Sequence, residues 1–317
     1  MDEFEIIRRY FLDQSTHRDD VRLGIGDDAA ILRVPPGQEL VASVDSLIAG
    51  VHFPEDLSAA AIGHRALAVN LSDLAAMGAA PIWGLLALSL PRVDEKWIRE
   101  FARGFFTLAQ RYRVALVGGN LARGPLNITV TVHGLVPAGQ ALLRSGAQPG
   151  NQVYVTGWLG DAAAGLHMLQ ASMRITETDS CVQRFCFPEP RIQAGLALRD
   201  IASSAIDISD GLAADLGHLL QASGVGARLQ VDQLPLSPSL LQHRIRNEAV
   251  NLALSGGDDY ELCFTVPGER IPLLESHARE FGCSVTRVGE ITASKDLRCL
   301  KDDNTDWPLP VAGYKHF

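Results

Sequence analysis

The sequence predicts a protein of two α/β or α+β domains, and three observations support this fold class. The chain has 317 residues, which is long for a single hydrophobic core. Segments with the patterns of strands and of helices follow one another in both halves. Residues 137–151, PAGQALLRSGAQPGN, are rich in Gly, Pro and small residues and separate the halves. We place the boundary there, with domains of residues 1–138 and 139–317.

The expected elements of the first half follow from local patterns. The opening segment MDEFEIIRRYFLDQ has the spacing of an amphipathic helix. A buried strand is expected at 39–45, ending at Asp45, and a short buried strand at 113–120, running into a Gly-Gly turn. Further strands are expected at 82–91 and 126–136. Helices are expected at 57–77, stopped by Gly78, and at 94–112, capped by Asp94.

The second half repeats this alternation. QVYVTG predicts a strand and GDAAAGLHMLQ a helix, and AIDISDGLAADLGHLL predicts a strand, a turn and a helix. GVGARLQV, DYELCFTV and CSVTRVGEI predict three more strands, and IPLLESHAREFG predicts a helix.

Composition excludes several classes of function. A net charge of −9 argues against a nucleic-acid-binding surface, which needs a basic patch. No apolar run reaches the ~18 residues of a membrane span, and the N-terminus lacks the features of a signal peptide. The five cysteines form no CxxC pair, so we expect reduced thiols in a cytoplasmic protein.

The most informative pattern is the placement of aspartates that interrupt apolar segments. They follow glycine turns, end strands or lie inside an apolar helix: Asp28, Asp45, Asp73, Asp207, Asp210, Asp258 and Asp259. Such carboxylates are costly unless they are hydrogen-bonded, paired or bound to metal. Asn70 and Asp73 lie one helical turn apart and share a face.

Each aspartate also has a structural explanation when it is taken alone. Asp210 fits a helix N-cap, Asp258 fits a turn after Gly-Gly, and Asp45 fits the end of a strand. Asp73 is the hardest to explain in this way, because helix interiors disfavour Asp. Together, acids beside glycine turns favour one shared site.

That site is predicted to bind Mg²⁺ and a nucleotide. Oxygen ligands without His or Cys clusters favour Mg²⁺ or Ca²⁺ over zinc, and the Ca²⁺ pattern DxDxDG is absent. Mg²⁺ commonly accompanies phosphate, which glycine-turn N–H groups also bind. The sequence has no GxxxxGK[ST], no complete GxGxxG and no HRD or DFG kinase motif. Metal ions would therefore hold the polyphosphate.

Ten segments in order over the whole chain closely resemble the thiamine-monophosphate kinase family of the aminoimidazole ribonucleotide synthetase superfamily. They are GIGDDAAI, SVDSLIAGVHF, ALAVNLSDLAAMGA, LVGGN, RGPL, RSGA, VTGWLGDAAAGL, IDISDGLAADL, SGGDDYELCF and GYKHF. The resemblance implies a two-domain α/β (α+β) fold and transfer of the ATP γ-phosphoryl group to thiamine monophosphate. It also implies a homodimer whose N-terminal domains pair through a barrel-like sheet.

The resemblance assigns roles residue by residue. The implied Mg²⁺ ligands are Asp28, Ser43, Val44 (through its carbonyl), Asp45, Asp73, Asn120, Asp207 and Asp210. The implied ATP contacts are Gly118, Gly119, Asn120, Arg144 and Ser209, and the implied substrate contacts are His52, Asp258 and Tyr314, with Trp307 as the alternative to Tyr314. No covalent nucleophile is implied. Catalysis would be direct in-line transfer with several Mg²⁺ ions, by positioning and charge neutralisation.

The chain departs from the family pattern at Asn120, where the family usually has Asp, at Leu121 and Val44, where it has Thr, and at Asp258, where it has Glu. Three alternatives stay open. A sibling ATP-dependent synthetase would use the same ATP chemistry on another substrate. A nucleotide or thiamine-phosphate sensor would bind its ligand without turnover. A structural metal-binding protein would only hold metal ions.

Overall fold

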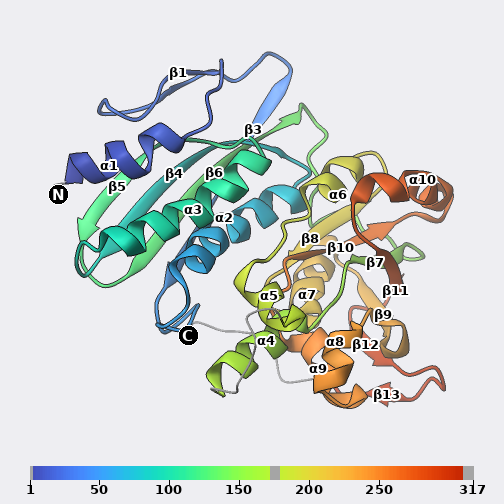
Figure 1. The fold of residues 1–317 in the computed structure, drawn as a ribbon. Helices are drawn as coiled ribbons and strands as arrows, with labels where there is room; N and C mark the ends of the chain where they lie inside the picture. Colours follow the sequence, from blue (N-terminus) through green and yellow to red (C-terminus); the bar gives the residue numbers. More distant parts are fainter. Residues whose placement is uncertain (1–2, 172–178, 310–317) are drawn as a thin grey trace. The chain divides into compact units, whose positions relative to one another are not determined.

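The computed structural model describes residues 3–171 and 179–309. The chain divides into two compact units, Met1–Leu74 with Ala79–Gly139 and Ala75–Gly78 with Gln140–Phe317. Each unit contains its own sheet and helices (Figure 1).

The first unit is built on a four-stranded sheet in the order β3-β6-β4-β5. Its strands are β3 (Gln38–Ile48), β4 (Ala80–Leu90), β5 (Ala115–Arg123) and β6 (Asn127–Pro137). β6 runs antiparallel to both β3 and β4, and β4 and β5 are parallel. A small hairpin of β1 (Val21–Leu23) and β2 (Ile31–Leu32) forms a separate two-stranded sheet.

Two long helices cover one face of this sheet, α2 (Ala59–Ala76) and α3 (Glu95–Arg111), with α1 (Glu3–Tyr10) beside them (Figure 1). The expected cap is confirmed, because the Asp94 carboxylate accepts hydrogen bonds from the backbone of Lys96 and Trp97. α2 and α3 pack closely, since a Cβ on Gly63 or Gly104 would collide with the backbone of the other helix.

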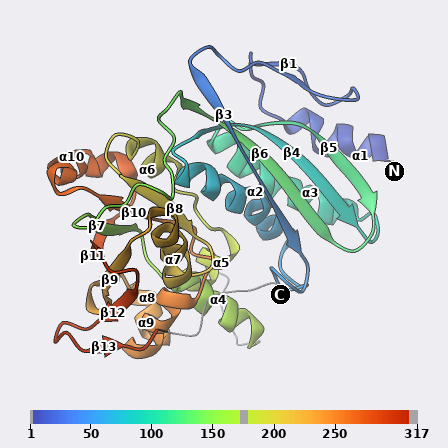
Figure 2. The ribbon, with the colours of Figure 1, turned by 180° about the vertical axis from the view of Figure 1, so that it is seen from behind.

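Among the described residues of this unit, no helix lies on the other face of the sheet (Figure 2). Part of it is covered by the hairpin, whose Val21 and Leu32 pack against a buried cluster of Ile82, Trp83, Ala115 and Val117. Elsewhere it exposes apolar side chains of the edge strand β3, namely Leu40, Val44 and Ile48. Even-numbered positions of β3 therefore face away from the helices, as the alternation of side chains along a strand requires.

The second unit is built on a seven-stranded mixed sheet in the order β13-β12-β9-β11-β7-β10-β8. Its strands are β7 (Gln152–Thr156), β8 (Ser204–Ile208), β9 (Gly226–Gln230), β10 (Glu261–Val266), β11 (Val285–Thr292), β12 (Leu297–Leu300) and β13 (Asp306–Trp307). β7, β8 and β10 are almost fully buried, and their mainly apolar sequences include a few buried polar residues such as Asp207 and Glu261.

The helices of the second unit are α4 (Asp161–Gln170), α5 (Ser180–Cys186), α6 (Ile192–Ala197), α7 (Leu212–Ser223), α8 (Pro238–His243), α9 (Arg246–Ser255) and α10 (Ile271–His277). The predicted helix at the IPLLESHAREFG segment is shorter than expected, because Ala278–Phe281 continues as a 3₁₀ turn. The remaining predicted strands and helices of this unit are present.

Two predictions for the first unit are wrong. β3 does not end at Asp45 and is not buried, because its pairing with β6 continues to Ile48 and its outer face is exposed. Gly118 and Gly119 do not form a turn but lie inside β5, where the register with β4 shifts. A Cβ on Gly119 would collide with the Leu86 carbonyl, so glycine is needed there for close strand approach.

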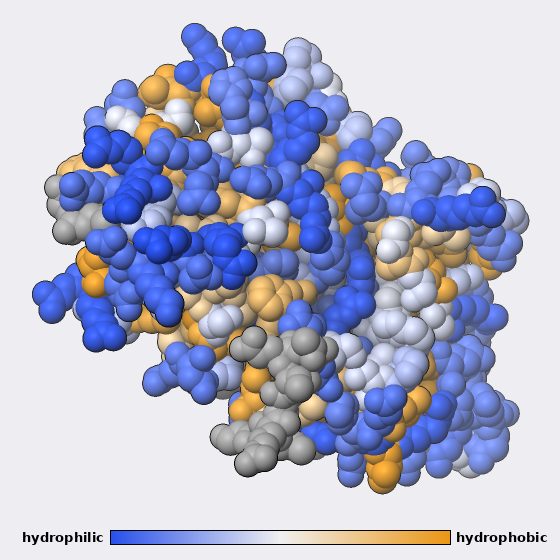
Figure 3. All heavy atoms as spheres, viewed as in Figure 1, coloured by the Kyte–Doolittle hydropathy of each residue, from blue (hydrophilic) through white to orange (hydrophobic). Residues whose placement is uncertain are grey.

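All five cysteines are free thiols, as expected. Within the described part of the chain, no helix is long and apolar enough to cross a membrane. The face drawn in Figure 3 is mostly hydrophilic.

Candidate active site

Two polar contacts in the first unit join β3 to α2. The Ser43 hydroxyl donates to the Asp73 carboxylate, with 2.5 Å between Oγ and Oδ2. The Asp45 backbone N–H donates to Asn70 Oδ1 at 2.9 Å, and the Asn70 amide donates to the Ala66 carbonyl. Asn70 and Asp73 therefore share a helix face, as predicted, and that face points at β3.

Three other residues predicted to bind Mg²⁺ in this unit, Asp28, Val44 and Asp45, are exposed. The Asp28 backbone N–H donates to Asp27 Oδ1, after a turn in which Gly26 has φ +122°. His52 is half-buried, and its Nδ1 accepts from the Ile48 backbone N–H at 3.0 Å, so it stabilises the turn that follows β3.

Strand register places Asn120 on the sheet face opposite Ser43 and Asp45. Asn120 pairs with Ala87, Ala87 with Thr129, and Thr129 with Ser46, and directly paired residues share a face. Ser46 and Thr129 confirm this by a 2.6 Å contact between their hydroxyls. Within one copy of this unit, Asn120 therefore does not meet the Ser43–Asp73 pair.

In the second unit, three sequence motifs meet at one edge of the sheet, where β7 and β8 end and β10 begins. β7 and β8 are both antiparallel to β10, so the ends of β7 and β8 lie beside the start of β10. The segments there are TGWLGD after β7, ISDGL after β8 and GGDDY before β10. The topology thus brings Ser209, Asp210 and Asp258 to the same place.

Asp215, in the first turn of α7, holds the ISDGL turn together. Its Oδ2 accepts hydrogen bonds from the backbone N–H groups of Ser209 (3.0 Å) and Asp210 (2.9 Å). Asp215 is 3 % exposed, and burial, with the nearby Asp210 charge, raises its pKa to about 7 against these hydrogen bonds and the Arg144 charge. Arg144 therefore lies within electrostatic range of this turn.

The ISDGL turn and the GGDDY loop are also joined through their backbones. The Asp258 N–H donates to the Ser209 carbonyl and the Tyr260 N–H to the Ile208 carbonyl, each at 2.8 Å. A Cβ on Gly257 would lie 2.6 Å from the Ser209 carbonyl oxygen, so only glycine allows this approach. Asp207, on β8, is buried.

A buried ion pair supports this edge and was missed from the sequence. The Arg191 guanidinium donates to both carboxylate oxygens of Glu261 at 2.6 and 2.5 Å, and the Thr156 hydroxyl donates to the same carboxylate at 2.6 Å. A Cβ on Gly157 would collide with the Glu261 carboxylate. Glu261 is 1 % exposed. The only sign of this ion pair in the sequence is an acidic residue, Glu261, at the start of an otherwise mainly apolar strand.

The structure describes only one of the two aromatic residues predicted as alternatives for substrate contact. Tyr314 lies outside the described residues. Trp307 is on β13, where its indole N–H donates to Asn251 Oδ1 and its ring lies 5.4 Å from the Lys301 ammonium. β13 is the strand at the opposite end of the sheet from β8.

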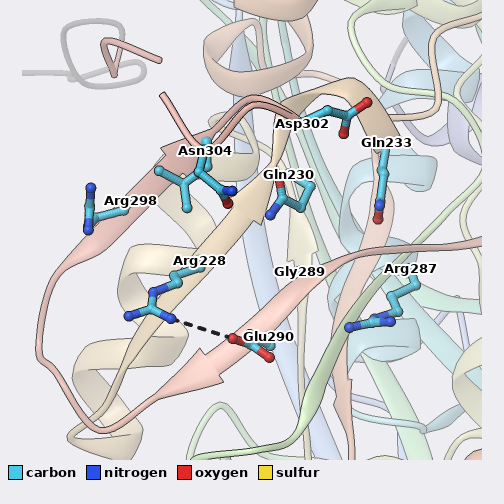
Figure 4. Close-up of a pocket in the computed structure, with 10 residues that line it drawn as sticks. Arg228, Gln230, Gln233, Arg287, Gly289, Glu290, Arg298, Asp302 and Asn304 are labelled. Atoms are coloured by element: carbon cyan, nitrogen blue, oxygen red, sulfur yellow. Dashed lines mark ion pairs between the residues drawn. The ribbon is translucent and has the colours of Figure 1, made fainter. Parts of the chain in front are cut away.

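A pocket of about 510 Å³ lies on β9, β11 and β12, also away from β8 and β10 (Figure 4). It is lined by Arg228, Gln230, Gln233, Arg287, Gly289, Glu290, Arg298, Leu300, Asp302 and Asn304, none of which is a predicted site residue. Arg228 lies 3.8 Å from Glu290 and Arg298 lies 2.8 Å from Asp306, so much of its positive charge is already paired.

Neither unit, over its described residues, holds three or more His, Cys, Asp or Glu side chains close enough to bind a metal ion. The predicted metal ligands come from both units and include the Ser43 hydroxyl, the Val44 carbonyl and the Asn120 amide. The shared metal cluster therefore stays a prediction.

Comparison with known families defines the class of protein. The family described as AIR synthase related protein, N-terminal domain, matches residues 26–136, and the corresponding C-terminal domain matches residues 148–301. The structure of E. coli HypE, a hydrogenase maturation protein, is similar with a TM-score of 0.78 at 19% identity, covering 98% of each chain. At that identity the likeness shows the fold alone.

Closer relatives define the family. Thiamine-monophosphate kinase of Salmonella typhimurium is 49% identical over 322 residues, 99% of this chain and 98% of that protein, and the Bacillus subtilis enzyme is 36% identical over 334 residues, the whole of both chains. The chain belongs to the thiamine-monophosphate kinase family.

Solved structures agree with this family. That of thiamine-monophosphate kinase from Stenotrophomonas maltophilia K279a has a TM-score of 0.88 and 44% identity over 94% of this chain and 96% of that chain. A structure described as AaThiL complexed with AMPPCP and TMP has a TM-score of 0.79 and 32% identity, covering 90% of this chain and 89% of that chain.

Proposed function

We propose that this protein transfers the γ-phosphoryl group of ATP to thiamine monophosphate, forming thiamine diphosphate and ADP. The observation that carries the proposal is the meeting of the ISDGL turn and the GGDDY loop at one sheet edge, linked by backbone hydrogen bonds at 2.8 Å. Full-length relatives named thiamine-monophosphate kinase and the AaThiL complex with AMPPCP and TMP support the same reaction.

The donor atoms fit Mg²⁺. Ser43 and Asp73 present oxygen atoms within 2.5 Å of each other, and Asp207, Ser209 and Asp210 add further oxygens at the end of β8. Hard oxygen donors of this kind select Mg²⁺ over zinc. Asp28, Ser43, Val44, Asp45, Asp73, Asn120, Asp207 and Asp210 would hold several ions. Bound Mg²⁺ would neutralise charge on the two anionic substrates.

The chain's own groups bind and orient the substrates. Gly118, Gly119, Asn120, Arg144 and Ser209 are proposed to bind ATP, with Arg144 offering a planar set of donors to phosphate. Because the acceptor phosphate oxygen is anionic near neutral pH, no strong general base is required. Direct in-line transfer then depends on positioning.

The cationic end of thiamine monophosphate needs a negative partner, and we assign this role to Asp258. Its carboxylate is half-buried at the sheet edge that also carries Ser209 and Asp210. An aromatic ring, with Tyr314 as the candidate, would add a cation–π contact, and His52 would lie near the substrate phosphate.

We further propose a cytoplasmic homodimer in which the open faces of two N-terminal sheets pair into a barrel-like structure. Leu40, Val44 and Ile48 are 46, 57 and 41 % exposed on the edge strand β3, and a second copy would bury them. Residues 1–138 would then serve ATP and Mg²⁺ binding and dimerisation, and residues 139–317 would complete the ATP and thiamine phosphate sites.

Direct product detection tests the proposed reaction. The purified protein is incubated with ATP, Mg²⁺ and thiamine monophosphate, and the thiamine phosphates are separated by chromatography. Thiamine diphosphate formed in step with ADP is the expected result. ADP without thiamine diphosphate would indicate a sibling substrate, and ATP binding without ADP would indicate a sensor.

A further inference from the structure

The carboxylate proposed to bind the cationic end of the substrate is itself held by its neighbours in the chain. The Tyr260 hydroxyl donates to Asp258 Oδ1, with 3.0 Å between the two oxygen atoms. Tyr260 is 8 % exposed, so its ring is fixed by packing and its hydroxyl has a defined position. The bond therefore restricts the rotation of the Asp258 side chain.

The backbone of the same loop is fixed by Asp259. Both of its carboxylate oxygens lie 3.0 Å from the backbone nitrogen of Gly160, which donates to them at the start of α4. Gly160 itself packs closely against α9, because a Cβ there would lie 2.8 Å from the Ala253 nitrogen. Asp259 thus anchors the GGDDY loop to the TGWLGD turn.

The loop conformation shows why such anchoring is needed. Asp258 and Tyr260, the two residues that flank Asp259, have φ values of +60° and +49°. L-residues with side chains disfavour this left-handed region, and two such residues in one short loop store strain that surrounding contacts must offset. Strain of this kind is commonly retained where a side chain must point in one direction.

We infer that Tyr260 and Asp259 are positioning residues, which hold the Asp258 carboxylate in the orientation that binds the cationic end of the substrate. The inference rests on the proposed function, because that function supplies the cation. Tyr260 acts on the carboxylate itself through one hydroxyl, and Asp259 acts on the backbone that carries it. Neither residue needs to touch the substrate.

The substitution Tyr260→Phe removes a single oxygen atom and tests the first half of the inference. The expected result is a rise of about tenfold in both KM and Kd for thiamine monophosphate, since hydrogen bonds to charged groups have effects of this size. The kcat and the Kd for the non-hydrolysable analogue AMPPCP should stay within about threefold of the wild-type values. The matched control is Tyr154→Phe on β7, where a second buried tyrosine stacks on Phe264.

Two substitutions of Asp259 test the second half. Asp259→Asn keeps the size of the side chain and one acceptor oxygen for the Gly160 N–H, whereas Asp259→Ala removes both acceptor oxygens. Asp259→Asn is expected to bind thiamine monophosphate within about threefold of wild type, whereas Asp259→Ala should weaken binding about tenfold. Asp94→Ala, which removes a carboxylate cap in the other unit, is the control for stability loss alone.

Measuring the binding of thiamine monophosphate by calorimetry distinguishes a failure of this inference from a failure of the proposed function. If the wild type binds thiamine monophosphate but forms no thiamine diphosphate, the proposed reaction is wrong, while the Kd values of the variants still test the positioning. The inference is overturned if Tyr260→Phe binds thiamine monophosphate as tightly as Tyr154→Phe, or if Asp258→Ala leaves that binding unchanged. Equal losses in Asp259→Asn and Asp259→Ala would overturn the role of Asp259.

Discussion

The Ser43 hydroxyl on β3 donates a hydrogen bond to the Asp73 carboxylate on α2, with 2.5 Å between the two oxygen atoms. This contact explains why an aspartate is kept inside an apolar helix, a position that disfavours it. It also brings together two of the oxygen donors proposed for Mg²⁺.

Asp73→Asn should lower the rate of thiamine diphosphate formation about tenfold or more at low Mg²⁺, because the site loses a negative charge. High Mg²⁺ should restore part of the rate. The measurement is the Mg²⁺ dependence of turnover, with the exposed Asp56→Asn as the matched control. Equal Mg²⁺ requirements in both variants would show that Asp73 does not bind the metal.

Asn120→Asp should have the opposite effect. It adds a carboxylate at a position proposed to bind Mg²⁺, so half-maximal turnover should need about threefold less Mg²⁺. Asn120 is exposed on β5, so the substitution should leave the free energy of unfolding nearly unchanged. An unchanged Mg²⁺ dependence would show that this position does not contribute a metal ligand.

Asp215→Ala should lower both stability and turnover. The substitution leaves the backbone N–H groups of Ser209 and Asp210 without their acceptor, and one unsatisfied buried group costs about 1–3 kcal/mol. Asp215→Asn keeps one acceptor oxygen and should lose less. Urea unfolding and kcat are measured for both, with the exposed Asp200→Ala as the control. A kcat in Asp215→Ala equal to that of the control would mean that the turn holds its shape without Asp215.

His133 should make the first unit less stable in acid. Burial lowers its pKa below the ordinary 6.5, and its Nδ1 is buried with no hydrogen-bond partner in the described structure. As pH falls through 6.5, the unfolded chain takes up a proton that the folded chain does not, so stability decreases by up to about 1.4 kcal/mol per pH unit. Above pH 6.5 both states are neutral and the contribution is complete.

The check for His133 is urea unfolding at pH 7.5 and 5.5. His133→Gln should lose less stability between these pH values than the wild type, and the exposed His17→Gln in the same unit should behave as the wild type does. Equal losses in all three proteins would contradict the prediction.

Much of the fold could be predicted because its cues are local. The cap at Asp94, the shared face of Asn70 and Asp73 and the turn after β8 all depend on residues within a few positions of one another. The length of β3 was not predictable in this way, since it depends on pairing with β6. The close approach of Gly119 to Leu86 is likewise a contact between distant segments.

In the candidate site, too, features set by neighbouring residues could be predicted and features set by tertiary contacts could not. Its acidic motifs were visible as aspartates beside glycines, but the residues that orient them were not. The sequence pattern did not single out Asp215. It placed Tyr260 in a strand, whereas the structure gives Tyr260 a φ of +49° and a contact with Asp258. Both roles depend on tertiary contacts.

The most direct test of the account is transfer of label from [γ-³²P]ATP to thiamine monophosphate by the wild-type protein in the presence of Mg²⁺. The account predicts that labelled thiamine diphosphate forms in a one-to-one ratio with ADP and that chelation of Mg²⁺ abolishes both products. Release of the label only as inorganic phosphate, or transfer that persists without Mg²⁺, would contradict it.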